Sequence, residues 1–135
     1  MDLIVCLDDR NGMSFAGRRQ SKDRVLRQKM LEQVGDATLW MDSYSASQFE
    51  SLPENVKISQ DLAEDASAGE YCFLERGDLG ALKDKLEDIL IFRWNRHYPS
   101  DKKFPMELLE GRTLAYAGEF AGSSHERITL EVYKL

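Results

Sequence analysis

The pattern of apolar runs changes once along the chain, and this change constrains the fold more than any other feature. Up to residue 94, short apolar runs typical of strands alternate with segments that have helical spacing. Beyond Pro105, residues 113–120 and 127–134 form two long strand-like runs with no helix between them. Alternating strands and helices favour a parallel sheet, and two strands joined by a short turn pair antiparallel. We therefore expect a three-layer α/β fold, with a mostly parallel central sheet, helices on both faces and a C-terminal antiparallel hairpin.

The individual elements follow from spacing and capping. The continuous apolar run Leu3–Leu7 predicts an interior strand that is covered on both faces. Apolar residues at helical spacing predict a helix from Ser21 to about Gln33, with Ser21 as its N-cap and Gly35 at its exit. Further strands are expected at residues 37–41, 56–58, 71–74 and 89–94, and further helices from Asp42 to about Glu50 and from Asp78 onward.

Length and composition predict one cytoplasmic domain over residues 1–135. A chain of 135 residues closes around a single core, and 42% apolar with 31% charged residues is an ordinary globular balance. The first apolar run is far shorter than the roughly 20 residues that span a bilayer, and Asp2 replaces the positive start of a signal peptide. Cys6 and Cys72 both lie in apolar runs, which favours buried, reduced thiols and a cytoplasmic location. The net charge of −6 disfavours attraction to an anionic membrane, so no membrane partner is expected.

Several strings resemble dihydrofolate reductase. Leu3–Met13 is similar to that family's first strand and the Gly-Met turn after it, and Ile89–Pro105 is similar to its sixth strand and following loop. Glu119–Phe120 and His125–Lys134 are similar to its last two strands, so that the resemblance covers nearly the whole chain. It implies a dihydrofolate reductase-like fold, NADPH as cofactor and a catalytic acid near the start of the first long helix, where Asp23 is the nearest match.

The cofactor positions depart from the family's pattern. Asp42-Ser43-Tyr44-Ser45 stands where the family holds the cofactor phosphates, and a carboxylate at Asp42 would repel the 2′-phosphate. Glu75-Arg76 replaces a Gly-Gly pair that lets the backbone approach the nicotinamide, so side chains fill that approach. Phe92 replaces a threonine that assists substrate binding. NADPH-dependent folate reduction is therefore not expected.

The chain also resembles small bacterial proteins that carry the label ribonuclease Z. Enzymes of that name bind two zinc ions through a histidine-rich motif, whereas this chain has only His97 and His125. The residues do not support the label, and no metal site is expected.

The most unusual stretch is Arg18–Lys29, which carries a net charge of +5 in a protein of −6, so that the rest of the chain carries −11. If Ser21 caps the helix, its free backbone N–H groups and the guanidinium groups of Arg18 and Arg19 can converge on one anion. The carboxyl ends of the strands would add Asp42, Ser43, Ser45, Glu75 and Arg76 to the same cleft. The alternative is a solvated helix face balanced by the acidic surface.

Two histidine segments remain. Residues 94–99 combine aromatic, basic and amide groups around His97, a composition that can stack on a heterocycle or simply cover the core. His125 lies among hydroxyl groups in the closing hairpin, and we expect a turn residue bonded to its neighbours, because no third orienting group is evident.

These observations favour a protein that binds an anionic, phosphate- or carboxylate-bearing small molecule without folate reductase activity. The first alternative is a diverged NADPH-dependent reductase of a pterin-like substrate, with Asp23 as its acid. The second is an RNA-binding or nuclease-related protein, although a net charge of −6 disfavours nucleic acid as a partner of the whole surface. The oligomeric state and the presence of any catalysis stay open.

Overall fold

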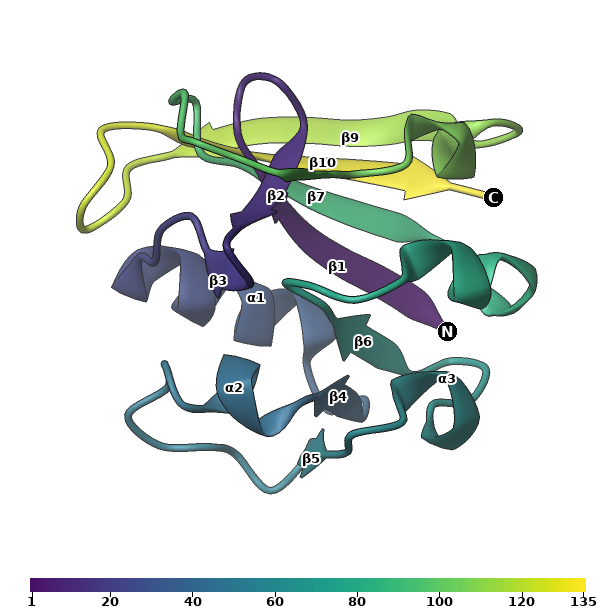
Figure 1. Cartoon of the computed structure of the whole chain (residues 1–135). Coiled ribbons are helices and arrows are strands. Elements are labelled where there is room, and N and C mark those ends of the chain that lie inside the picture. The colour runs from purple at the N-terminus through teal and green to yellow at the C-terminus, as the bar shows by residue number, and fades with distance from the viewer.

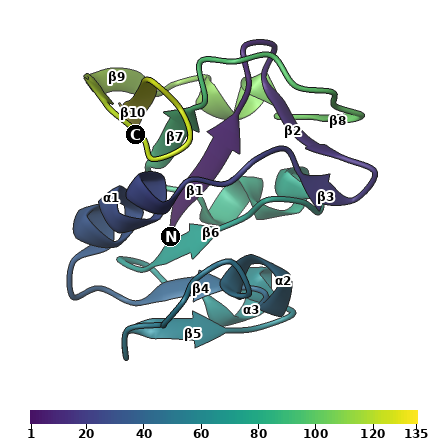
Figure 2. The ribbon, with the colours of Figure 1, turned by 90° about the vertical axis from the view of Figure 1, so that its left-hand side faces the viewer.

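The computed structural model describes residues 1–135 and contains a seven-stranded sheet (Figures 1 and 2). Its strand order is β5-β4-β6-β1-β7-β10-β9. The first five of these strands pair in parallel, and β10 pairs antiparallel with both β7 and β9. The bounds are β1 (Asp2–Leu7), β4 (Leu39–Met41), β5 (Val56–Ile58), β6 (Tyr71–Phe73), β7 (Ile89–Arg93), β9 (Thr113–Phe120) and β10 (Ile128–Lys134).

Helices cover both faces of this sheet. On one face, Ile4 of β1 packs in one apolar cluster with Leu26 and Met30 of α1 (Arg24–Val34). On the other face, Leu3, Val5 and Leu7 pack with residues of α3 (Leu62–Asp65), η1 (Leu79–Lys85) and η2 (Met106–Leu109), where η1 and η2 are 3₁₀ helices. The expected three-layer α/β fold with its antiparallel C-terminal hairpin is confirmed. None of the helices combines the length and apolar character needed to cross a bilayer.

A second, three-stranded sheet was not predicted. It consists of β3 (Arg18–Arg19), β2 (Gly12–Phe15) and β8 (Lys102–Lys103), in that order. Gly12 permits the close approach of the residue 100 loop, because a Cβ there would lie 2.6 Å from Cβ of Ser100. Strands of two to four residues are too short to show a clear periodicity, so only the tertiary pairing reveals them.

The predicted start of the first helix is wrong. The helix α1 begins at Arg24, and the N-cap is Asp23, whose carboxylate accepts a hydrogen bond from the Leu26 N–H at 3.0 Å. Ser21 lies outside the helix, and Arg18 and Arg19 belong to β3. Because a carboxylate already satisfies the first turn, the basic residues do not converge on an open helix N-terminus. The predicted exit at Gly35 is observed, with a φ of 60°.

The other helices are shorter or tighter than predicted. The helix α2 (Ser43–Ala46) ends before Glu50, and the segment after Asp78 is the 3₁₀ helix η1. The predicted strands agree with β4, β5, β6 and β7 to within two residues at each end. Cys6 and Cys72 are free thiols.

Candidate functional site

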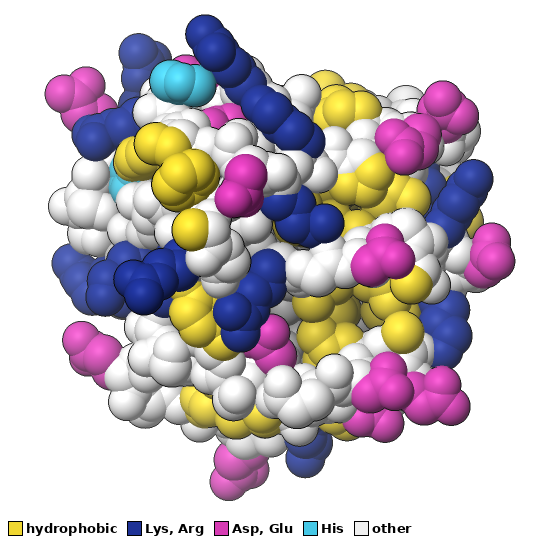
Figure 3. Space-filling view, viewed as in Figure 1, with side chains coloured by type: hydrophobic (Ala, Val, Ile, Leu, Met, Phe, Trp, Pro, Cys, Tyr) yellow, Lys and Arg dark blue, Asp and Glu magenta, His cyan; other side chains and the backbone are white.

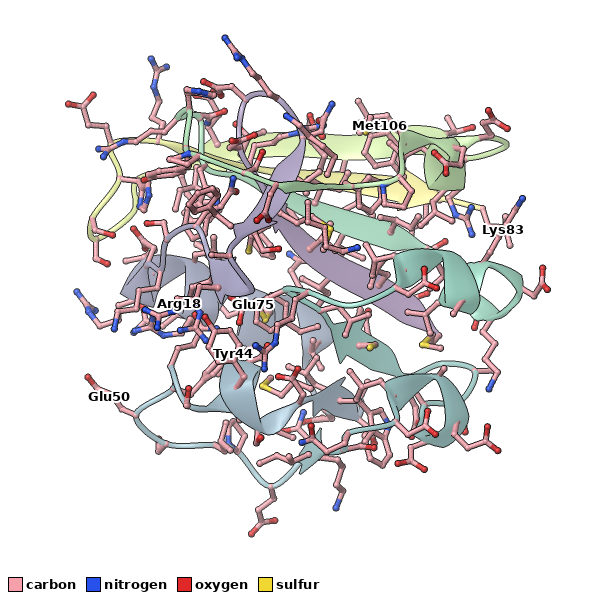
Figure 4. The ribbon with its side chains drawn as sticks, in the orientation of Figure 1. Arg18, Tyr44, Glu50, Glu75, Lys83 and Met106 are labelled. Carbon is pink, nitrogen blue, oxygen red and sulfur yellow. The ribbon has the colours of Figure 1, made fainter.

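A buried carboxylate, Glu75, binds Arg19 where the parallel strands end. Figure 4 labels Glu75 together with Tyr44 and Arg18 in this region. Arg19 Nε donates to both carboxylate oxygens, at 3.0 and 3.2 Å, and Arg19 Nη2 donates to Oε1 at 3.2 Å. Ser45 Oγ and Gln48 Nε2 donate to the same Oε1 at 2.9 and 3.1 Å. We call these residues, with Tyr44, the Arg19–Glu75 cluster; its charges are neutralised internally.

The Tyr44 ring lies against two guanidinium groups. Cζ of Arg19 is 4.1 Å and Cζ of Arg76 is 4.0 Å from the ring centroid, distances typical of cation–π contacts. Arg76 also lies 3.9 Å from the carboxylate of Asp42. Asp42 itself caps α2, because its Oδ1 accepts from the Ser45 N–H at 2.8 Å. Asp42, Tyr44 and Arg76, which the resemblance puts at the cofactor positions, are therefore joined through the contacts of Arg76.

Little space remains between the strand ends. A void of about 10 Å³ is lined by Cys6, Met13, Arg19, Gln20, Ser21, Glu75 and Trp94. This volume is near the smallest that holds one water molecule, roughly 10–15 Å³. The side chains of the Arg19–Glu75 cluster therefore fill most of this region.

A second cluster surrounds His125, which is 4% exposed in the β9–β10 hairpin. Its Nδ1 lies 3.1 Å from Asp23 Oδ2, and its Nε2 lies 2.8 Å from Tyr98 Oη and 3.2 Å from Ser21 Oγ. The imidazole stacks on the indole of Trp94, with ring centroids 4.6 Å apart. We call Ser21, Asp23, Trp94, Tyr98 and His125 the His125 cluster.

The Asp23 carboxylate joins the hairpin to the start of α1. Besides the Leu26 N–H, it accepts from the N–H groups of Ser123 and Ser124 at 3.0 and 2.8 Å. Burial alone would raise the pKa of Asp23, but these donors and His125 lower it far below the usual range for aspartate. Gly122 permits this approach, since a Cβ there would lie 2.4 Å from Asp23 Oδ2. Both oxygens of Asp23 are thus engaged by the protein itself.

A cavity of about 470 Å³ opens beside these clusters. Arg18 is exposed at its wall and forms no ion pair, unlike Arg19. Gln20 Nε2 donates to Asp8 Oδ2 at 3.1 Å and to the Pro99 carbonyl at 3.3 Å, whereas its Oε1 is buried without a partner. Figure 3 shows Lys and Arg side chains gathered over β3 and the start of α1. We call it the β3 cavity; its walls are Phe15, Ala16, Arg18, Arg19, Gln20, Tyr98 and Pro99.

Another cavity, of about 390 Å³, is lined by α3, η1 and the residues that follow β4 and β6. Figure 3 shows hydrophobic side chains in this hollow. Its rim carries Asp42, Asp61 and Asp78 against the single cation Arg76. Each of the three aspartates caps a helix: α2, α3 and η1 respectively. The helix ends that could attract a phosphate are therefore already bound to carboxylates.

The structure brings together only part of the predicted site. Arg19, Ser45 and Glu75 meet in one cluster, and Ser21 and Asp23 meet in the other. Ser43 is exposed and accepts from Gln60, and His97 is exposed outside both clusters.

The prediction for His125 needs correction. Its orienting group is Asp23, 102 residues earlier, and not only its neighbours in the turn. No local signal in the sequence could reveal a partner at that separation, because the contact depends on the hairpin folding over α1.

The side chains form neither a grouped metal-binding set nor an activated thiol. No three His, Cys, Asp or Glu side chains are grouped to hold a metal ion. Burial raises the pKa of Cys72 to about 12, and burial together with the Glu75 charge raises the pKa of Cys6. Neither thiol is poised as a nucleophile.

Comparison with known proteins identifies the fold. No protein-family model matches the chain. The fold is similar to dihydrofolate reductase from Enterococcus faecalis in complex with NADP(H) and RAB-propyl, with a TM-score of 0.69 and 11% identity, over 98% of this chain and 94% of that one. In sequence, the chain is 30% identical over 120 residues to the medium-chain fatty acid–acyl-carrier-protein ligase JamA of Moorena producens (strain JHB). The match covers 80% of this chain, which spans about a fifth of the ligase's length.

Proposed function

We propose that this protein binds a small molecule with a carboxylate or phosphate group in the β3 cavity and has no folate reductase activity. The observation that carries the proposal is the guanidinium of Arg18, which lies at the wall of a 470 Å³ cavity without an acidic partner. The adjacent Arg19 is held by Glu75, so Arg18 is the cation left for a ligand. A free guanidinium binds carboxylate or phosphate through paired hydrogen bonds.

The other walls favour a ligand with an apolar body. Phe15 is 49% exposed, and its ring, together with Pro99 and the Tyr98 ring, gives the cavity an apolar side. A carboxylic acid with a short apolar chain matches both this apolar side and the guanidinium of Arg18.

The resemblance to the ligase supports the carboxylate over the phosphate. The relative's name states a medium-chain fatty acid as its substrate, and such an acid combines an anionic head with an apolar body. Since this chain spans only a fifth of the ligase, the resemblance supports the ligand class and not the ligase reaction.

The family's cofactor does not fit the residues present. The resemblance puts the cofactor phosphates at residues 42–45, beside a cavity lined by the carboxylates of Asp42, Asp61 and Asp78, which already cap the helix ends there. The nicotinamide side is filled by the Arg19–Glu75 cluster. Asp23 has both oxygens engaged and is 2% exposed, so it is not presented to a pterin. These features support a binding role over a reductase role. We propose that a single cytoplasmic domain carries this role.

Isothermal titration with octanoate tests the proposal. We expect wild-type protein to bind octanoate with a Kd below about 1 mM and to give no thermal shift with NADPH. Arg18→Gln is expected to weaken octanoate binding about tenfold or more, because a charge-assisted hydrogen bond is lost.

Arg10→Gln is the matched control, because Arg10 is exposed and lines none of the cavities described above. Its affinity for octanoate should equal that of the wild type. The proposal is wrong if octanoate and inorganic phosphate both fail to bind, or if Arg10→Gln weakens binding as much as Arg18→Gln.

A further inference from the structure

Three side chains from two distant segments are linked within the His125 cluster. Ser21 Oγ is 3.2 Å from His125 Nε2, and His125 Nδ1 is 3.1 Å from Asp23 Oδ2. Ser21 precedes α1, Asp23 caps α1, and His125 belongs to the β9–β10 hairpin. A hydroxyl, an imidazole and a buried carboxylate in this order are the arrangement that activates a serine.

The imidazole is fixed in the orientation that this chemistry needs. The Asp23 carboxylate accepts a hydrogen bond from Nδ1–H, which leaves the lone pair of Nε2 facing Ser21 and Tyr98. Stacking on Trp94 and burial hold the ring in place. The Asp23 carboxylate is fixed in turn by three backbone N–H groups. Little reorganisation is then required before a proton moves to Nε2.

We propose that Ser21 is the nucleophile of an acyl-transfer site, with His125 as its general base and Asp23 as a positioning residue, acting on an ester or thioester of a carboxylic acid. Ser21 Oγ forms a bond to the acyl carbon while its proton moves to His125 Nε2. The bond from that carbon to the leaving oxygen or sulfur breaks, and the leaving group takes the proton from Nε2. Water then attacks the acyl-serine and passes its proton through Nε2 to Ser21 Oγ, which releases the carboxylic acid.

Tyr98 supplies the donor for the charge that develops in this reaction. Its Oη is 2.8 Å from His125 Nε2 and 3.4 Å from Ser21 Oγ. A hydroxyl so close to the attacking oxygen can donate to the anionic oxygen of the tetrahedral intermediate once Nε2 is protonated.

The substrate reaches Ser21 from the β3 cavity. Arg19 and Gln20 line both this cavity and the 10 Å³ void at Ser21, so their side chains separate the two spaces. Arg19 is bound firmly to Glu75, whereas Gln20 has two hydrogen bonds of 3.1 and 3.3 Å and an unpartnered Oε1. Gln20 is therefore the side chain that must move. Only this route rests on the function proposed above; the reactivity of Ser21 does not depend on anion binding by Arg18.

Labelling with an alkyl fluorophosphonate tests the proposal. The probe forms an Oγ–P bond with an activated serine, fluoride leaves, and the serine proton passes to the general base. We expect wild-type protein to gain one adduct in intact-mass spectra, which peptide mapping assigns to Ser21. Gln20→Ala should label faster, because the partition is removed, and Ser21→Ala should not label.

Ser67→Ala serves as the matched control, because Ser67 is an exposed serine outside both clusters, and it should label as the wild type does. Arg18→Gln should also label as the wild type does, which separates this proposal from the anion site. An adduct on Tyr98 or on any other residue overturns the assignment of Ser21. Absence of an adduct in both the wild type and a folded Gln20→Ala variant, as judged by circular dichroism, overturns the proposal altogether.

Discussion

At the scale of single residues, Asp23 is a buried carboxylate that accepts hydrogen bonds from three separate parts of the structure. It is the residue that the resemblance to reductases marks as a catalytic acid, yet its oxygens accept hydrogen bonds from the backbone of α1, the hairpin loop and His125. A carboxylate with that many donors stays ionised and holds its neighbours in place. Asp23 therefore anchors the hairpin loop to the start of α1 and orients His125.

The ionised form of Asp23 makes the protein's stability depend on pH. Because the pKa of Asp23 is lower in the folded than in the unfolded chain, its contribution is complete above the unfolded value of about 4 and falls as the pH drops further. Asp23→Asn should cost about 2–3 kcal/mol at pH 7, since hydrogen bonds to a charged group are lost. Urea unfolding at pH 7 and at pH 3 measures both quantities.

The gap between the wild type and Asp23→Asn should narrow at pH 3. A gap that stays constant from pH 7 to pH 3 would show that Asp23 is not the titrating anchor. Ser67→Ala provides the control, because it should follow the wild type at both pH values.

At the scale of elements, aspartates begin the helices that surround the strand ends. Asp23, Asp42, Asp61 and Asp78 cap α1, α2, α3 and η1. Each cap satisfies backbone N–H groups and offsets the positive end of the helix dipole. An array of capped helix ends is a poor receptor for phosphate, and for this reason we propose the anion site at Arg18 of β3 and not at a helix end.

The caps formed by Asp42 and Asp61 differ in geometry, so we expect their removal to lower the free energy of unfolding by different amounts. Asp42 Oδ1 accepts from Ser45 N at 2.8 Å and the residue is partly buried, whereas exposed Asp61 accepts from Glu64 N at 3.3 Å. We expect Asp42→Ala to cost about 1–2 kcal/mol and Asp61→Ala about 0.5 kcal/mol. Urea unfolding of the two variants under the same conditions makes the comparison. Equal losses would contradict the difference inferred from the geometry.

At the scale of the whole molecule, the Arg19–Glu75 pair connects the small sheet to the large one. Arg19 belongs to β3, and Glu75 follows β6 in the seven-stranded sheet. The side chains are 19% and 6% exposed, so each charge depends on the other for compensation. The pair thereby leaves only a void of about 10 Å³ between these strand ends.

A double-mutant cycle tests this connection. Arg19→Met or Glu75→Gln alone should cost about 3 kcal/mol, because each leaves its partner buried without an opposite charge. The double variant should cost clearly less than the sum of the two, with a coupling of about 1–3 kcal/mol. Strict additivity in urea unfolding would mean that the two side chains do not stabilise one another.

The order of local patterns along the sequence predicted the architecture. The unbroken apolar run at Leu3–Leu7, the helical spacing before Gly35 and the two long terminal strands specified a parallel sheet with an antiparallel hairpin, because such patterns depend on residues a few positions apart. The N-cap of α1 was misplaced by two residues, since Ser21 and Asp23 are both good caps and only the bonds to the hairpin loop distinguish them.

The candidate sites depended on the tertiary structure. The sequence predicted that Arg18, Arg19 and Glu75 lie near one another. Only the packing of β3 against the strand ends decides that Arg19 pairs with Glu75 and that Arg18 has no acidic partner. His125 gained Asp23 and Ser21 as partners across more than 100 residues of chain, by closure of a hairpin over a helix. Local physics fixes elements, whereas contacts between distant side chains exist only once those elements are packed.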